Sequence, residues 1–398
     1  MTIADLTLAQ RIEKVTSLAM TPGAEVYLDP ADVDFEAWNH VGDPLCEALI
    51  TTMREHKLMG GDLYETARSL EAEGLPEAVA FFADVEAIPS WLDVDALRAG
   101  ASMGRRNPIG LIFGMHGGLP FTYIDPSTAE VIGATGRLGR GGYARRFWET
   151  AVGFVGALDV EGMLPGGERW IQWVRIRFLH TMIRLGIHRS GRWPLYDTAT
   201  PISQVASAAT PYIFGQYRVN IIESFGGVVA REERDSFALM WRWVARIEGA
   251  NNQLLGRSHQ EEFELQRLNH AFLYGRSEKA VELTRDLIAG TGGMAIFGRS
   301  KSFNAAVVRR VLAPSMIATL PDRDVRELLD VHPNSLADGA VAAFALALKG
   351  VGLASRLGPV RRLADRHGQA FLDGLVQHQL RGAKAEFRET PVHGDPAA

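Results

Sequence analysis

The sequence predicts an all-α protein. Apolar residues recur every three or four positions along most of the chain, no segment shows the strict alternation of a half-buried strand, and proline and glycine separate the helical stretches. In the first part the expected helices cover residues 6–19, 45–55, 63–72, 77–85 and 94–103. Later helices are expected over residues 143–158, 166–187, 201–213, 219–225, 231–249, 278–289, 303–312, 337–348 and 358–380.

One stretch departs from this pattern. Residues 114–142 are rich in glycine and are expected to be irregular, apart from a short helix over residues 127–132. Long irregular segments in compact domains often carry function. The glycines from Gly133 to Gly142 have the spacing of neither a phosphate-binding loop nor a dinucleotide fingerprint, so nucleotide binding is not expected.

The chain is expected to form one large helical unit. Its 398 residues would allow two or three domains at roughly 150 residues each, but no repeat and no long Pro-, Ser- or Gly-rich linker divides it. The expected organisation is an N-terminal helical extension (1–85), a core (86–275), C-terminal helices packed on the core (276–389) and a disordered tail (390–398).

Composition excludes several classes of protein. With 42 basic and 47 acidic residues the net charge is −5, which gives no basic field for nucleic acid. A single cysteine, Cys46, excludes a disulfide framework and an all-cysteine metal or iron–sulfur site. The most apolar run, residues 340–348, is shorter than the about 20 residues of a spanning helix. The N-terminus shows no export signal, so a cytoplasmic location without a membrane span is expected.

The most informative helix carries a histidine between two arginines. Trp173, Arg177, His180 and Arg184 follow at intervals of four, three and four, which places them on one stripe of the helix. Two nearby cations lower the pKa of an imidazole and keep it neutral, the form that binds metals. Arginines on the same face suit carboxylates, including haem propionates. The alternative is a surface helix with a solvated polar stripe.

No metal cluster is visible in the sequence. There is no Glu-x-x-His unit of a di-iron bundle, no HExxH and no Gly-x-Ser-x-Gly elbow. His259 and His270, eleven residues apart, are expected to be surface or capping residues. If His180 binds iron, it does so as a single protein ligand, which indicates haem.

Two further groups precede and follow this helix. Arg146 and Thr150 are one turn apart and share a face of the helix after the glycine-rich stretch, with a capped, solvated first turn as the alternative. Residues 200–203 (Thr-Pro-Ile-Ser) predict an N-cap with proline at the first helical position, opening a helix that carries Thr210. Capping alone would also explain the second group.

Together these motifs resemble the MpaB-type oxygenase domain, the catalytic domain of the latex clearing protein family of rubber oxygenases. The pattern Arg177-x-x-His180-x-x-x-Arg184 is followed by Trp193, Pro201-Ile202, Thr210 and Phe214. Other family elements occur in the same order: Ile88-Pro-Ser-Trp91-Leu-Asp93 with Gly100, Gly118-Leu119-Pro120-x-x-Tyr123, Thr135-Gly136-Arg137-Leu138, Arg146-x-x-x-Thr150 and residues 249–255. The resemblance spans residues 89–262.

The resemblance implies a b-type haem in a globin-like helical core. His180 would be the proximal iron ligand, and Arg177 and Arg184 would steady its helix and the haem environment. Thr210 would also contribute to cofactor binding. These roles follow from the match to the family motif.

On the opposite side of the haem, the resemblance implies a site for dioxygen near Arg146 and Thr150, with Glu130 as a catalytic-site glutamate. Latex clearing proteins carry a lysine directly before the threonine, where this chain has Glu149. A carboxylate there is expected to pair with an arginine and not to coordinate iron. This departure, and the lack of an export signal, favour a smaller apolar unsaturated substrate over solid rubber.

The implied reaction is oxidative cleavage of an isoprenoid C=C bond by dioxygen, with an electron donor as a possible partner. Phe113, Phe121, Phe147 and Trp148 are candidates for the substrate pocket, or else ordinary core residues. Two other classes stay open: a haem-binding sensor or carrier without oxygenase turnover, and a helical interaction protein that has lost the cofactor.

Overall fold

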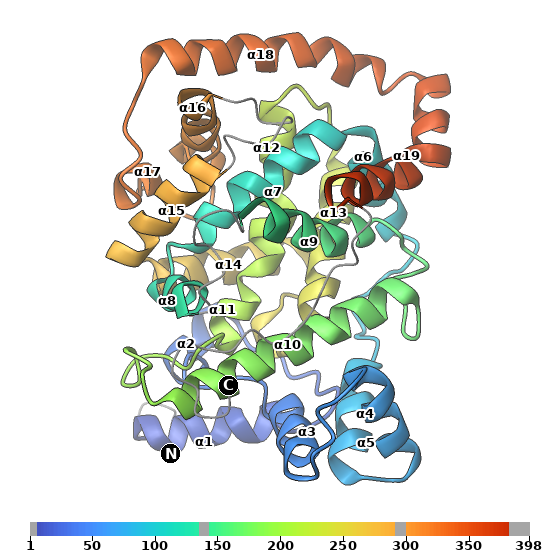
Figure 1. Ribbon diagram of the computed structural model, residues 1–398, viewed down its shortest axis with the longest axis vertical. Coiled ribbons are helices and arrows are strands. Elements are labelled where there is room, and N and C mark those ends of the chain that lie inside the picture. Colours follow the sequence, from blue (N-terminus) through green and yellow to red (C-terminus); the bar gives the residue numbers. More distant parts are fainter. Residues whose placement is uncertain (1–5, 135–142, 291–299, 382–398) are drawn as a thin grey trace.

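Helices α1 to α19 dominate the computed structural model, which describes residues 6–134, 143–290 and 300–381 (Figure 1). No strand occurs in these ranges, so the all-α prediction is confirmed for the described part of the chain. The expected tail 390–398 and the motif Thr135-Gly136-Arg137-Leu138 lie outside the described residues.

The first half of the fold runs from α1 to α10. Its helices are α1 (Leu8–Ala19), α2 (Phe35–Trp38), α3 (Pro44–Glu55), α4 (Leu63–Ala72), α5 (Pro76–Val85), α6 (Leu97–Arg106), α7 (Pro108–Thr122), α8 (Pro126–Ala134), α9 (Tyr143–Gly156) and α10 (Glu168–Ser190). The helix starts follow local sequence signals: the Asp43 and Asp62 side chains accept hydrogen bonds from the first turns of α3 and α4.

The second half runs from α11 to α19. Its helices are α11 (Gln204–Ala208), α12 (Tyr217–Ser224), α13 (Arg231–Ile247), α14 (His259–Leu273), α15 (Glu278–Gly290), α16 (Lys301–Val311), α17 (Val325–Leu328), α18 (Ser335–Ala354) and α19 (Gly358–Gln379). A π-helical segment, Tyr212–Gln216, leads into α12. Such segments interrupt the regular hydrogen-bond ladder and are frequent at functional sites.

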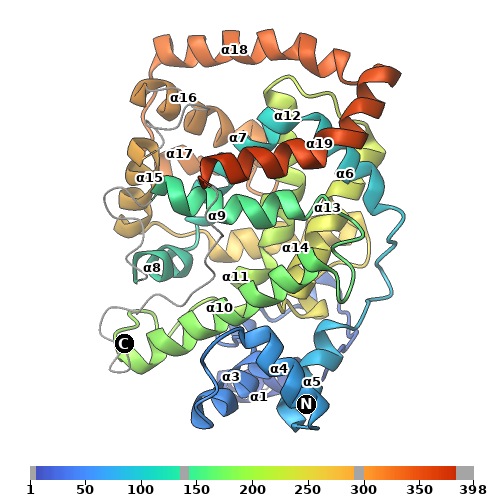
Figure 2. The ribbon, with the colours of Figure 1, turned by 45° about the vertical axis from the view of Figure 1, so that its right-hand side comes forward.

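Helix α10 lies between two parts of the molecule. In both ribbon views α1, α3, α4 and α5 lie on one side of it and the remaining long helices on the other (Figures 1 and 2). One hydrophobic cluster extends from Val15 to Leu380 and includes the fully buried Trp38, Trp170 and Trp243. Residues from all three expected helical parts therefore share one core.

The prediction that residues 114–142 are irregular is wrong for their first part. Helix α7 continues through Gly114, Gly117 and Gly118 to Thr122. A Cβ atom on Gly114 would lie 2.4 Å from Cγ of Arg218, and one on Gly117 would lie 2.6 Å from Cγ2 of Val311. These glycines allow close helix packing, and that contact outweighs their low intrinsic helix propensity.

The helix expected over residues 201–213 also begins later than predicted. Ser203, not Thr200, is the N-cap, because its Oγ accepts a hydrogen bond from the backbone N–H of Ala206. The carbonyls of Pro201 and Ile202 instead accept hydrogen bonds from Arg184. Arg184 therefore donates to the carbonyls that would have accepted hydrogen bonds within a helix starting at residue 201.

Helix α18 is longer than the apolar run that predicts it. Over an 18-residue window its mean hydropathy is 1.6, and by length and composition alone it could cross a membrane. The expected helix ended at residue 348, but α18 continues past Lys349 through Gly350, Val351 and Leu353. In both ribbon views α18 lies across the end of the molecule opposite to α1, α3 and α4 (Figures 1 and 2).

Candidate functional site

An apolar cavity of about 280 Å³ lies beside His180. Its walls come from α7, α8, α10, α11, the π-helical segment and α14. The apolar lining residues are Leu119, Ile124, Val131, Ile132, Leu179, Ile183, Ile202, Ala206, Ala209, Ile213 and Leu273. Mostly apolar walls with a few convergent polar groups are typical of small-molecule and cofactor sites.

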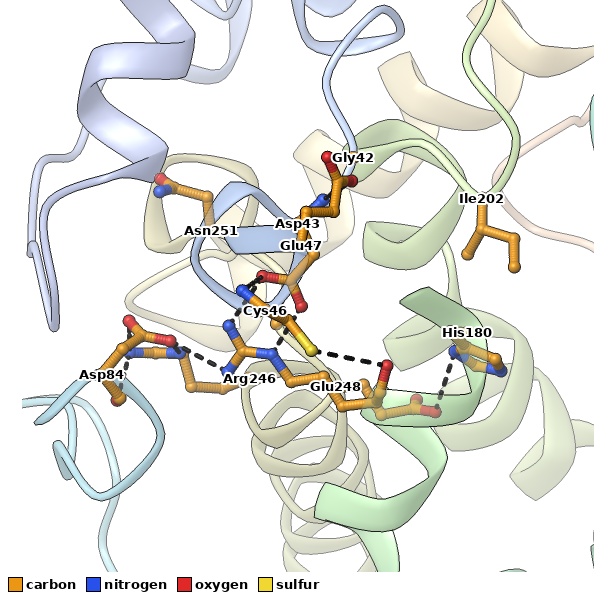
Figure 3. A network of polar contacts seen from close by, with 12 residues as sticks. Gly42, Asp43, Cys46, Glu47, Asp84, His180, Ile202, Arg246, Glu248 and Asn251 are labelled. Atoms are coloured by element: carbon orange, nitrogen blue, oxygen red, sulfur yellow. Dashed lines mark hydrogen bonds and ion pairs between the residues drawn. The ribbon is translucent and has the colours of Figure 1, made fainter. Parts of the chain in front are cut away.

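His180 and Glu248 form the titratable pair of this cavity. Nδ1 of His180 lies 3.7 Å from Oε1 of Glu248, which follows the last residue of α13 (Figure 3). Burial raises the pKa of the Glu248 carboxyl to about 8. The His180 side chain is 37% exposed, since one side of the ring faces the cavity. A carboxyl group behind a histidine can orient a metal-ligating imidazole through its oxygen atoms.

The other polar residues of the lining are largely satisfied within the protein. Thr122 and Thr210 donate to the carbonyls of Leu119 and Ser207 in their own helical segments. The carboxylate of Asp125 accepts hydrogen bonds from the side chains and backbone of Ser127 and Thr128 at the start of α8. These groups shape the cavity, and His180 and Glu248 lie beside them in the same lining.

Arg177 lies behind the cavity in a buried ion network. Its guanidinium contacts Asp43 through Nε (2.6 Å) and Nη2 (2.9 Å), and Asp84 through Nη1 (2.9 Å). Arg246 binds the same Asp84 at 2.7 Å. Burial alone would raise the pKa of Asp84, but Arg246 and Arg177 hold it well below its usual range. The network joins α3, α5, α10 and α13.

The end of α13 brings this network and the histidine pair together. Arg246 binds Asp84, and Glu248 lies next to His180 (Figure 3). Gly249, the next residue, packs against Arg177. Gly249 has φ +93°, and a Cβ atom there would lie 2.6 Å from Oδ2 of Asp43 and 2.7 Å from Nε of Arg177. Only glycine combines that backbone conformation with this close approach.

Arg184 holds a wall of the cavity. It donates to the carbonyls of Pro201 (2.9 Å) and Ile202 (2.6 Å) and lies 3.1 Å from the carboxylate of Glu47. Ile202 lines the cavity with φ +50°, a left-handed conformation that is rare for a β-branched residue. The two hydrogen bonds from Arg184 offset this strain. The stripe of arginines is buried, so it is not the solvated surface stripe.

The other predicted site residues lie elsewhere. Thr150 is half-buried on α9 and does not line this cavity. Arg146 belongs to the same helix, but its side chain lies outside the described residues. Glu130, on α8, is half-buried. The pKa of Lys279 is raised mainly by its hydrogen bond to Glu282, with a smaller contribution from the charge of Glu130. Glu149 pairs with Arg145 at 2.9 Å, which is the kind of ion pair expected for it.

The four aromatic candidates for a substrate pocket are buried in the main core. Phe113, Phe121, Phe147 and Trp148 are each 2% exposed or less and do not line the described cavity. Phe113 packs on Phe225 with ring centroids 4.6 Å apart. The alternative, that they are ordinary core residues, accounts for their positions.

Sequence reasoning missed one residue of the cavity, Glu248, and misplaced another, His270. Glu248 carries no motif of its own, and only its position directly before Gly249 could have drawn attention to it. His270, expected at the surface, is fully buried in the cavity wall, and its Nδ1 lies 2.9 Å from Oγ1 of Thr319. Burial lowers the pKa of His270 to about 3. The expectation failed because its face of α14 packs inward.

Arg218 is another buried arginine, but unlike Arg177 and Arg184 it has no anionic partner among the described residues. Arg218 is fully buried, and none of its guanidinium nitrogens has a hydrogen-bond partner there. Its Cζ lies 4.5 Å from the ring centre of Phe154, 5.2 Å from Trp241 and 6.0 Å from Phe214. Cation–π contacts with three rings offset part of the cost of burying this charge.

The solved structure of latex clearing protein in its closed state superposes on this chain with a TM-score of 0.56 and 16% sequence identity. The alignment covers 88% of this chain and 96% of that chain. The chain has the fold of latex clearing protein. No protein-family model and no curated protein matches the sequence.

The shared fold with latex clearing protein is wider than the motifs that pointed to it. The motifs span residues 89–262, whereas 88% of this chain aligns with latex clearing protein. Helices that the sequence analysis treated as additions at the two ends therefore belong in large part to the shared fold. The resemblance to the latex clearing protein family is confirmed at the level of the fold.

Proposed function

We propose that this chain is a haem b-dependent oxygenase with a globin-like haem-binding core, which uses dioxygen to cleave a C=C bond of an apolar, isoprenoid-like substrate. The observation that carries the proposal is the His180–Glu248 pair at an apolar cavity. The latex clearing protein fold around this pair supports an oxygenase over other uses of a buried histidine.

The donor set at the cavity fits haem. No group of three His, Cys, Asp or Glu side chains that could hold a metal ion occurs within the described ranges, which disfavours a non-haem centre there. A single imidazole beside apolar walls is what haem b needs from its protein. When bound, haem supplies an iron atom at which dioxygen reacts. His180 would hold that iron through Nε2, since Nδ1 faces Glu248.

The residues around His180 would act by holding this side chain and its helix in position. Glu248 would accept a hydrogen bond from Nδ1–H and so fix the tautomer and orientation of His180. Arg184 would keep Ile202 against the cavity, and Arg177 would hold α10 in place through Asp43 and Asp84. These contacts act on the helix that carries the ligand, so they would preorganise it before the cofactor binds.

On the oxygen side we propose that Arg146 and Thr150 donate hydrogen bonds to the reacting oxygen, and that Glu130 contributes as a catalytic-site glutamate. The pairing of Glu149 with Arg145 supports a role for Glu149 away from the iron. The apolar walls support an apolar substrate, with aldehyde or ketone ends as products.

The test begins with the absorption spectrum of protein purified from cells supplied with a haem precursor. A Soret band in the wild type and its loss in His180→Ala are expected. His188→Ala is the matched control, because His188 lies on the same helix and binds Thr200 instead of lining the cavity. Oxygen uptake and carbonyl products with short isoprenoids then test turnover.

Each outcome discriminates between the open classes. A Soret band without oxygen-dependent product formation would favour a haem sensor or carrier. If the protein folds but takes up no haem, the result would favour the remaining class, a helical interaction protein without the cofactor. Equal haem content in His180→Ala and wild type would contradict the assignment of the ligand.

A further inference from the structure

The exposed apolar side chains of this protein are concentrated at one end of the fold. Among the described residues, eight of the fifteen large hydrophobic side chains that are exposed lie within residues 336–371. They are Leu336, Leu346, Val351, Leu353, Leu357, Val360, Leu363 and Phe371. We call the exposed side of α18 and the start of α19 the end surface. Exposed apolar side chains gathered in one place often mark an interaction site.

Helix α18 has one buried and one exposed apolar side. Val341 and Ala345 are buried on one side, whereas Leu336, Leu346 and Leu353 are 88%, 72% and 56% exposed on the other. The intervals of seven and ten residues between the three leucines place them on one stripe. Both sides of the helix are apolar, although only one packs on the protein.

Tertiary contacts keep α18 flat against the protein. The ring of Phe344 contacts Phe303, with centroids 6.0 Å apart, and Asp338 binds Arg309 at 2.7 Å. Near its end Gly352 packs on the carbonyl of Gly226, where a Cβ atom would lie 1.9 Å away. The helix is about 30 Å long and lies along the end of the molecule (Figure 2). Its exposed leucines therefore form a row there.

A basic segment follows directly on this row. Arg356, Arg361, Arg362 and Arg366 are all exposed, and Asp365 is the one acidic residue among them, which gives a local charge of +3 in a chain of net charge −5. Asp365 is shared between Arg105 (3.6 Å) and Arg361 (3.8 Å). An apolar helix face flanked by cations is typical of segments that lie in the interface of an anionic membrane.

We propose that the end surface docks on an anionic phospholipid bilayer, with α18 lying in the plane of the membrane and its leucines inserted among the acyl chains. The arginines after α18 would contact lipid phosphates. A second copy of this chain fits less well, because two end surfaces that met face to face would bring the same exposed arginines together. A bilayer matches both the apolar row and the positive charge.

The test is flotation of the full chain with vesicles of phosphatidylcholine containing phosphatidylglycerol, compared with phosphatidylcholine alone. The wild type should bind the anionic vesicles, and added salt should weaken this binding. Leu346→Glu combined with Leu353→Glu should weaken it at least about tenfold. Arg356→Gln and Arg362→Gln should each weaken it about fivefold.

The matched control is Val79→Glu combined with Ile88→Glu. Both residues are exposed hydrophobics, and they lie on or next to α5, at the other end of the fold. This variant should bind like the wild type, and circular dichroism should show that all variants keep their helical content. All six exchanged positions are exposed, so loss of folding is not expected to hide the result.

Three results would overturn the proposal. One is a wild type that ignores both kinds of vesicle. Another is a leucine variant that binds anionic vesicles as well as the wild type does. The third is binding that resists both high salt and alkaline carbonate, which would indicate a spanning helix. A wild-type dimer that the leucine exchanges dissociate, without vesicle binding, would assign the end surface to a second copy of the chain.

Discussion

The imidazole Nδ1 of His180 lies 3.7 Å from the Oε1 atom of Glu248, which directly follows a different helix, α13. This relationship separates His180 from an ordinary polar residue of α10. It gives one ring nitrogen a carboxyl partner and turns the ring toward an apolar cavity.

Exchanging Glu248 for Gln should lower haem affinity by about 10–100-fold, because the hydrogen-bond partner that orients a metal ligand contributes that much to binding. The measurement is titration of haem-free protein with haem, followed in the Soret region. Glu161→Gln serves as control, since Glu161 is exposed and pairs with Arg98 on the surface. Unchanged haem affinity in Glu248→Gln would show that the carboxyl does not support the ligand.

Arg177 and Arg218, which are both buried, should differ in how strongly replacement by methionine affects stability. Arg177→Met leaves Asp43 and Asp84 with fewer charge partners in a buried site, so the free energy of unfolding should fall by about 3–5 kcal/mol. Arg218→Met removes a buried charge without an anionic partner and should change stability by no more than about 1–2 kcal/mol. Urea unfolding of both variants measures the difference. A larger loss in Arg218→Met than in Arg177→Met would contradict this account.

Gly249→Ala should destabilise the protein more than Gly74→Ala. Both glycines have positive φ, +93° and +83°, so both exchanges carry a backbone cost of about 1–3 kcal/mol. Nothing lies within 4 Å of a Cβ atom at Gly74, whereas one at Gly249 would collide with Asp43 and Arg177. Thermal or urea unfolding gives both values. Equal losses would mean that the ion network can shift to accept a methyl group.

Stability should depend on pH through His270. Burial lowers the pKa of His270 to about 3, from 6.5, so between these values the unfolded chain binds a proton that the folded chain does not. Its contribution is therefore present above pH 6.5 and is lost as the pH falls toward 3. Between pH 6.5 and 5 the loss attributable to this group is on the order of 1–2 kcal/mol.

The test of this dependence compares urea unfolding of the wild type and His270→Gln at several pH values in that window. The variant should show a shallower loss of stability on acidification. His332→Gln, at an exposed histidine, should keep the slope of the wild type. Parallel slopes for the wild type and His270→Gln would show that His270 takes up its proton without unfolding.

The sequence predicted the helices well where local signals agree. The ranges expected for α4 and α5 match the structure within a residue, because helical periodicity coincides with the Asp62 cap in α4 and with Pro76 at the start of α5. It failed at α7, whose glycines are unfavourable for a helix in isolation. There the deciding factor is packing against Arg218 and Val311, which local sequence does not encode.

The sequence by itself determined the all-α class, the stripe of Arg177, His180 and Arg184, and the resemblance to the latex clearing protein family. Spacing along one helix is a local property, so it can be obtained from the order of residues. Only the tertiary structure decided what each stripe residue contacts: Asp43 and Asp84 for Arg177, the Pro201–Ile202 carbonyls for Arg184, and Glu248 for His180. These partners come from distant segments, and their approach depends on how the helices pack around one core.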